Sequence, residues 1–220
     1  MKWQYIFFTM MILLSGLSGS ECRRDCNPVI VPPDSISDNS TGLVPFKIGN
    51  KWYYNYYYYD TSGTQEPGFH YDSVVVTRDT IINKERWYKI RNFKGPDVDY
   101  LDWYTNRSDG IGVLRRVINQ YQDTAYAYLT FKYPTMRSEF WGSPLGDSTR
   151  VLSMNEVVET PSGIDTCIVY EDHYEFYSLG DFHYYFAPNK GWVMLELFSR
   201  TDSGRLFVIN RLLLVKAVLR

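Results

Sequence analysis

From residue 44 to residue 220, apolar and polar residues alternate in short runs that end at clusters of turn-forming residues. Aromatic and β-branched residues dominate the runs, and such side chains fit a pleated sheet better than a helix. Gly, Asn, Asp, Ser and Pro separate the runs and favour tight turns. We therefore predict strands at Lys51–Tyr59, Tyr71–Ile82, Glu85–Phe93, Tyr100–Thr105, Gly112–Ile118, Ala125–Tyr133, Arg150–Thr160, Ile164–Tyr177, Phe182–Ala187, Gly191–Thr201 and Arg205–Leu219.

The short connections favour antiparallel pairing of strands that follow one another in the chain. No stretch of a dozen residues has a 3.6-residue apolar period without a turn residue inside it, so we expect little helix. The predicted fold class is all-β, with a single curved antiparallel sheet or open half-barrel of about 10–11 strands. Leu212–Val215 is apolar without alternation, which predicts a central strand covered on both faces; a C-terminal helix is the alternative.

The first 43 residues differ from the rest. An apolar run from Tyr5 to Leu17 precedes small residues and is shorter than the roughly 20 residues that span a bilayer, which is typical of a secretory signal peptide. The following segment is rich in Pro, Ser, Asp and Asn and cannot build a core. We expect a signal peptide at residues 1–20, a disordered tether at 22–43 and one β domain at 44–220.

Cys22 distinguishes two routes of processing. A lipoprotein peptidase would cut after residue 21 and leave a lipidated cysteine that anchors the protein to a membrane. An ordinary signal peptidase would cut after Ser20 and release the protein. Glu21 is unusual before a lipidated cysteine, but the long polar tether suits an anchored domain. We expect an exported protein of the cell envelope, lipid-anchored through Cys22 to the outer membrane, or else periplasmic or secreted.

Two other cysteines, Cys26 and Cys167, are a candidate disulfide pair in an oxidising compartment. The alternative, which we favour, is that Cys167 is a small buried hydrophobic residue, because Ile168 and Val169 follow it. The formal net charge is -2 and Lys and Arg are scattered, so the chain lacks the basic stripe that nucleic acid requires.

Tyrosines concentrate in the first predicted strand. Alternation places four aromatic residues on one face, namely Trp52, Tyr54, Tyr56 and Tyr58, while Tyr53, Tyr57 and Tyr59 share the other. One face must belong to the core. An exposed face would be an aromatic surface that stacks sugars or contacts a partner, whereas a covered one is packing, the interpretation that we favour.

His173, Glu175 and His183 are the one metal-like set in the sequence. If the chain reverses near Leu179 and Gly180, Glu175 lies opposite His183, and the three side chains share one face. Two imidazoles and a carboxylate suit zinc or iron, but polar residues on the wet face of a hairpin are far commoner. We predict no bound metal and no cofactor.

Catalytic signatures are also missing from the sequence. It contains no G-x-S-x-G elbow, no metalloprotease helix motif and no Gly-rich phosphate loop. Carboxylates such as Asp97, Asp99, Asp102, Glu171 and Asp172 are abundant, but spacing alone does not pair them across a cleft. We therefore expect a protein that is not an enzyme.

Three segments, PFKIGNKWYY (45–54), ETPSGIDTC (159–167) and YYFAPNKGWV (184–193), carry a resemblance. Together they resemble segments of uncharacterised exported proteins and lipoproteins of Bacteroidetes-like bacteria. The resemblance implies a strongly curved antiparallel sheet, similar to the open half-barrels of periplasmic lipoprotein carriers, and implies no known activity.

The leading hypothesis for function is a non-enzymatic, lipid-anchored module of the cell envelope that binds or presents a ligand or an envelope protein at the envelope surface. One alternative is a carrier that holds an acyl chain or another apolar ligand on the concave face of the sheet. A second alternative is a carbohydrate-binding module that uses the tyrosine-rich strand.

Overall fold

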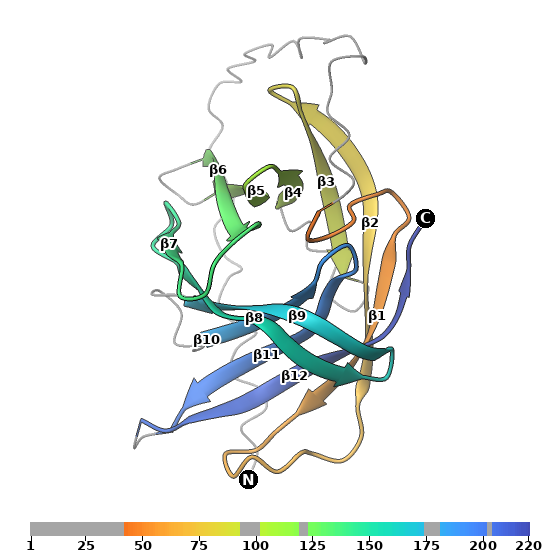
Figure 1. Cartoon of the computed structure of the whole chain (residues 1–220), viewed down its shortest axis with the longest axis vertical. Coiled ribbons are helices and arrows are strands. Elements are labelled where there is room, and N and C mark those ends of the chain that lie inside the picture. Colours follow the sequence, from red (N-terminus) through yellow and green to blue (C-terminus); the bar gives the residue numbers. More distant parts are fainter. Residues whose placement is uncertain (1–41, 93–101, 119–122, 174–180, 202–203) are drawn as a thin grey trace, which may run out of the picture. The chain divides into compact units, whose positions relative to one another are not determined.

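The computed structural model describes residues 42–92, 102–118, 123–173, 181–201 and 204–220, which belong to one compact unit (Figure 1). These residues form twelve strands and no helix. The strands are β1 (Lys51–Tyr58), β2 (His70–Ile82), β3 (Glu85–Asn92), β4 (Trp103–Arg107), β5 (Gly110–Ile118), β6 (Asp123–Lys132), β7 (Phe140–Gly142), β8 (Ser148–Thr160), β9 (Gly163–His173), β10 (Asp181–Ala187), β11 (Gly191–Arg200) and β12 (Leu206–Val218).

All twelve strands belong to one antiparallel sheet, in the order β6-β5-β4-β3-β2-β1-β12-β11-β10-β9-β8-β7. The all-β prediction and the open curved sheet are confirmed. The strand β7 was not predicted, because its three residues are too few to show alternation. Within the described residues, no helix has the length and apolar character needed to cross a membrane.

The C-terminal strand β12 lies centrally, between β1 and β11, as its unbroken apolar run predicts. Leu212, on one face of the strand, points into the space that the curved sheet encloses. Near Leu214 the tip of the β8–β9 hairpin meets β12, where the backbone N of Ser162 donates to the backbone O of Leu214 at 3.1 Å. Strand β12 is therefore contacted by more than its two sheet neighbours.

The sheet is strongly curved. Strands β6 and β9 are nine strand spacings apart in the sheet, which in a flat sheet amounts to about 43 Å. In the structure the rings of Phe131 on β6 and Tyr170 on β9 have centroids only 5.1 Å apart. The Tyr170 hydroxyl donates to the backbone O of Lys132 at 2.6 Å. Curvature thus brings the two halves of the sheet together around one interior.

The core fills much of this interior with aromatic side chains. Four aromatic side chains have an exposed fraction of 0%: Phe46, Trp52, Tyr170 and Phe186. The ring of Phe131 packs against those of Tyr170 and Phe186. The core begins before β1: Leu43, which the sequence assigned to the tether, has an exposed fraction of only 1 %. The backbone N of Asn189 also donates to the backbone O of Gly42 at 2.9 Å. The β domain therefore includes residues 42 and 43.

Candidate functional site

The three segments on which the resemblance rests meet in space. Trp52, from the first segment, is buried, and its indole Nε1 donates to the backbone O of Lys190, in the third, at 2.7 Å. The ring of Trp52 also makes an edge contact with Trp192, with centroids 5.8 Å apart. Between these residues, Gly191 has φ +93°, and a Cβ there would lie 3.2 Å from the Trp52 Nε1. The close approach explains a glycine at this turn.

The second segment contacts the same junction through an ion pair and a hydrogen bond. The Lys190 ammonium forms an ion pair with Asp165 at 2.6 Å and donates to the Ser162 hydroxyl at 3.3 Å. These contacts tie the β8–β9 hairpin to the β10–β11 turn. The three segments therefore build a structural junction.

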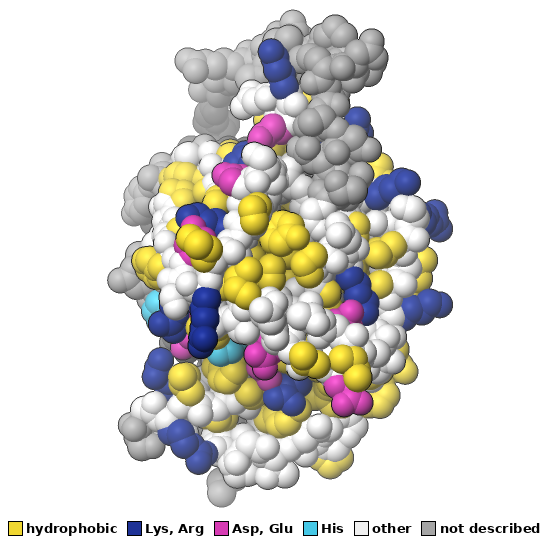
Figure 2. Space-filling view, viewed as in Figure 1, with side chains coloured by type: hydrophobic (Ala, Val, Ile, Leu, Met, Phe, Trp, Pro, Cys, Tyr) yellow, Lys and Arg dark blue, Asp and Glu magenta, His cyan; other side chains and the backbone are white. Residues whose placement is uncertain are grey.

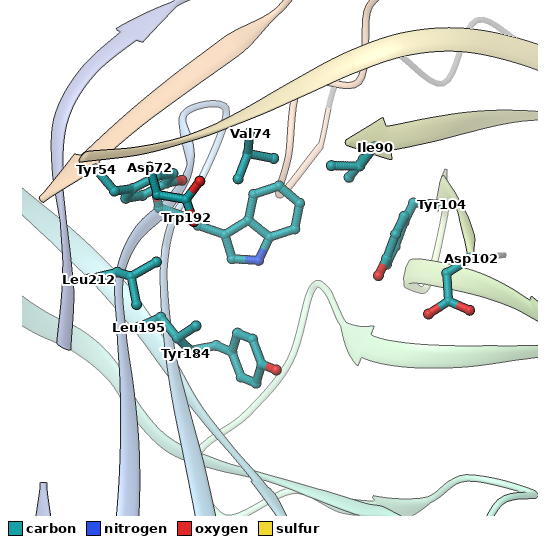
Figure 3. A pocket seen from close by; sticks show the side chains of 10 residues that line it. All are labelled: Tyr54, Asp72, Val74, Ile90, Asp102, Tyr104, Tyr184, Trp192, Leu195 and Leu212. Carbon is teal, nitrogen blue, oxygen red and sulfur yellow. The ribbon is translucent and has the colours of Figure 1, made fainter. Parts of the chain in front are cut away.

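Beside this junction lies a cavity of about 280 Å³ (Figure 3). Seven strands that are neighbours in the sheet, from β4 round to β10, contribute to its walls. The lining side chains are Tyr54, Asp72, Val74, Ile90, Asp102, Tyr104, Tyr184, Trp192, Leu195 and Leu212. Eight of the ten are aliphatic or aromatic, and the other two are carboxylates. An apolar pocket with a few convergent polar groups is the common form of a small-molecule site.

Asp102, one of the two carboxylates, is held by a cation from the protein. Its oxygens accept hydrogen bonds from the Arg115 Nε at 3.0 and 3.2 Å, and a second guanidinium nitrogen lies 2.9 Å away. The neighbouring Tyr104 hydroxyl is buried, and burial together with the Asp102 charge raises its pKa above the ordinary value. At neutral pH this end of the cavity therefore holds an ion pair and a protonated phenol.

Asp72, the other carboxylate, is placed differently. It is half-buried and accepts a hydrogen bond from the backbone N of Ser73 at 2.7 Å. Within the described residues no Lys, Arg or His forms an ion pair with Asp72. Its charge acts on nearby phenols: burial, then Tyr58, then Asp72 raise the pKa of Tyr56 to about 12. In Figure 3, Asp72 and Asp102 lie on opposite sides of the Trp192 indole.

A second hollow, of about 610 Å³, lies on the other face of the sheet. Its walls include His183 and Tyr185, which flank the cavity residue Tyr184 along β10 and so point the opposite way. These side chains already have partners: the Tyr185 hydroxyl donates to Glu196 at 2.7 Å, and the His183 Nε2 lies 3.5 Å from Glu171. The hollow is a polar surface groove, and the apolar cavity is the better candidate site.

The aromatic strand divides between core and surface. Of the four residues predicted to share a face, Trp52 and Tyr54 are buried, Tyr56 is half-buried and Tyr58 is exposed. The Tyr56 and Tyr58 rings are 4.8 Å apart but inclined at 55°. Two inclined rings do not form the flat surface on which a sugar ring stacks. Tyr54 lines the cavity, and its hydroxyl donates to the backbone O of Trp192 at 3.0 Å.

His173 and His183 each contact a carboxylate of the neighbouring strand. His173 contacts Asp181 at 2.6 Å, and the residue opposite His183 is Glu171, not Glu175 as the assumed turn required. Glu175 lies outside the described residues, as do Asp97 and Asp99, so the three-residue set is not assembled among them. The described residues contain no group of three or more metal-ligating side chains that could hold an ion.

Of the cysteines, the structure describes Cys167. Its side chain is buried, and burial raises the pKa of its thiol to about 12, which suits a small core residue. Cys22 and Cys26 lie outside the described residues, together with the predicted signal peptide and most of the tether. The lipid anchor and the disulfide therefore stay predictions.

Comparison with known proteins adds two solved structures. A protein of Bacteroides fragilis NCTC 9343, named as an exported protein with a YmcC-like fold, is similar to this chain with 14% identity and a TM-score of 0.42; the match covers 81% of this chain and 100% of that one. A protein of Parabacteroides distasonis ATCC 8503, named as a lipoprotein, has 12% identity and a TM-score of 0.38, covering 81% and 99%. No family model and no curated protein matches the chain.

Proposed function

We propose that this protein is an exported, non-enzymatic module of the cell envelope that binds a small ligand with an apolar part on the concave side of its sheet. The observation that supports the proposal is the cavity of about 280 Å³, close to the lower end of the volumes common for ligand pockets. Its walls stand on neighbouring strands of one sheet, so the site is formed before the ligand arrives.

The polar groups of the cavity support binding in preference to catalysis. Burial raises the pKa values of the Tyr54 and Tyr104 phenols, so neither side chain is a phenolate at neutral pH. The Asp102 carboxylate forms an ion pair with Arg115. Export, and attachment to a membrane through Cys22, rest on the apolar run and the cysteine near the start of the sequence. On the face shown in Figure 2, Lys and Arg are spread over several places, which suits a ligand other than a nucleic acid.

Filling the cavity tests the proposal. Val74 lines the cavity on β2, whereas Val157 on β8 is 67% exposed and provides a matched control. The fluorescent apolar probe N-phenyl-1-naphthylamine should bind the wild-type protein and the Val157→Phe variant equally. The Val74→Phe variant should bind it at least about tenfold more weakly, because the added ring atoms take up space that the probe needs.

Thermal unfolding of both variants shows whether each is folded before binding is compared. Failure of the wild-type protein to bind the probe, or equal binding by both variants, would exclude the cavity as the ligand site.

A further inference from the structure

Asp72 is a carboxylate in largely apolar surroundings. It lines the cavity together with Val74, Leu195 and Leu212. Asp72 is half-buried, so its carboxylate loses part of its hydration, which a cation or hydrogen bonds can replace. The described residues provide the backbone N of Ser73 as a donor and no ion pair. A positively charged group entering the cavity would therefore stabilise this carboxylate.

Asp102 shows the contrasting case within the same cavity. Arg115 neutralises it through two hydrogen bonds from Nε and an ion pair at 2.9 Å. A ligand cation would gain little there, because Arg115 already compensates the carboxylate and would repel a second positive charge. Among the described lining residues, the uncompensated negative charge is thus at Asp72.

Aromatic rings surround the same space. Tyr54, Tyr104, Tyr184 and Trp192 line the cavity from four different strands, and Figure 3 shows the three tyrosines placed around the indole. The negative faces of aromatic rings attract ammonium groups, and rings from several sides are the usual arrangement for binding quaternary ammonium. A sugar would instead need parallel exposed rings. The rings and Asp72 therefore favour the same kind of ligand.

We infer that the cavity selects an amphiphile with an ammonium head group, which pairs with Asp72 and contacts the rings while the apolar tail lies along Leu195 and Leu212. This inference rests on the proposed function, because it concerns the ligand of the same site. An anionic amphiphile such as a fatty acid is disfavoured, since its head group would meet the Asp72 carboxylate, and the lining residues that the structure describes include no Lys, Arg or His.

Three probes with the same tail separate the head-group effect from the tail effect. Hexyltrimethylammonium, hexanol and hexanoate each compete with N-phenyl-1-naphthylamine for the wild-type protein at neutral pH and low salt. The ammonium compound should displace the probe at a concentration about tenfold lower than hexanol does, and hexanoate should be the weakest.

The Asp72→Asn variant should bind the ammonium compound and hexanol about equally. Asp79, on the same strand, pairs with Arg86 outside the cavity, so the Asp79→Asn variant is a matched control that should retain the preference. Retained hexanol binding by Asp72→Asn shows that the cavity is intact in that variant.

The possible outcomes distinguish the two proposals. If none of the probes binds the wild-type protein, the proposed function fails and this inference with it. If hexanol or hexanoate binds as tightly as the ammonium compound, the proposed function stands and this inference is wrong. A preference for the ammonium compound that survives in Asp72→Asn would overturn the assignment to Asp72.

Discussion

At the scale of single residues, Trp52 has the clearest structural role. Its ring is fully buried, its Nε1 donates to a backbone oxygen 138 residues away in sequence, and its edge contacts Trp192. One side chain thereby joins the central strand β1 to the β10–β11 turn. Trp141 makes a similar bond, to the backbone O of Thr130 at 3.2 Å, but is only half-buried.

Replacing Trp52 with Phe should lower the free energy of unfolding by about 2 kcal/mol, because the hydrogen bond of a fully buried indole and part of the core packing are lost together. Urea unfolding followed by circular dichroism measures the change. The Trp141→Phe variant should cost less than about 1 kcal/mol, since water can reach the freed carbonyl. Equal costs for the two variants would contradict the role given to Trp52.

Alternation along the first strand placed Trp52 and Tyr54 on one face, and these two residues are indeed in the core. The same reasoning did not single out Asp72, Tyr104 or Trp192 as site residues. Their importance comes from strands that meet only because the sheet curves, and a residue's own neighbours in sequence carry no signal of that meeting.

At the scale of elements, all eleven predicted runs overlap strands of the structure, and the one strand that was not predicted is the shortest. The run ending at Ile82 was predicted to within one residue, whereas β7 was missed. The pairing of β9 with β10 was the least predictable feature. It depends on the length of the intervening turn, so a turn placed at Leu179 and Gly180 brought the wrong carboxylate opposite His183.

The β10–β11 turn offers a test of close packing between elements. Gly191 and Gly63 have similar φ angles, +93° and +86°, but a Cβ at Gly63 would meet nothing within 4 Å. Gly63→Ala should therefore report the cost of a left-handed alanine, about 1 kcal/mol. Gly191→Ala should cost about 1 kcal/mol more, because Trp52 must move.

Chemical denaturation of the two variants measures this difference. If they unfold at the same denaturant concentration, the contact between the turn and Trp52 does not contribute to stability.

At the scale of the whole molecule, the all-β class and an open curved sheet could be predicted, but how far the sheet curves could not. Alternation and short turns establish an antiparallel sheet. Its curvature accumulates from twist and from register shifts within the pairs, such as those near Tyr53 and Leu197, and these leave little mark in a single sequence. The position of the cavity follows from this curvature.

Buried phenols should make the folded molecule sensitive to high pH. Burial raises the pKa of six tyrosines, to about 12 for Tyr56 and Tyr128; the others are Tyr54, Tyr104, Tyr170 and Tyr185. An unfolded tyrosine loses its proton near pH 10, so above that pH the unfolded state binds fewer protons than the native state, and stability falls as pH rises.

Each such tyrosine should lower the free energy of unfolding by at most about 1.4 kcal/mol per pH unit above its unfolded pKa. Near-ultraviolet absorbance during alkaline titration should show one group of phenols that ionises near pH 10 and a second that ionises only as the protein unfolds. A single group titrating near pH 10 in the folded protein would contradict the burial described here.

Every pair of adjacent strands in the sheet is consecutive in the chain except β1 and β12, which hold its beginning and end together. If a short linker joined the C-terminus to residue 42 and the chain were opened in the segment between β6 and β7, the strands would follow one another through the sheet from first to last. Such a circular permutant would reach the same sheet by local hairpins alone, so it should fold faster than the natural chain, which must first close its longest loop.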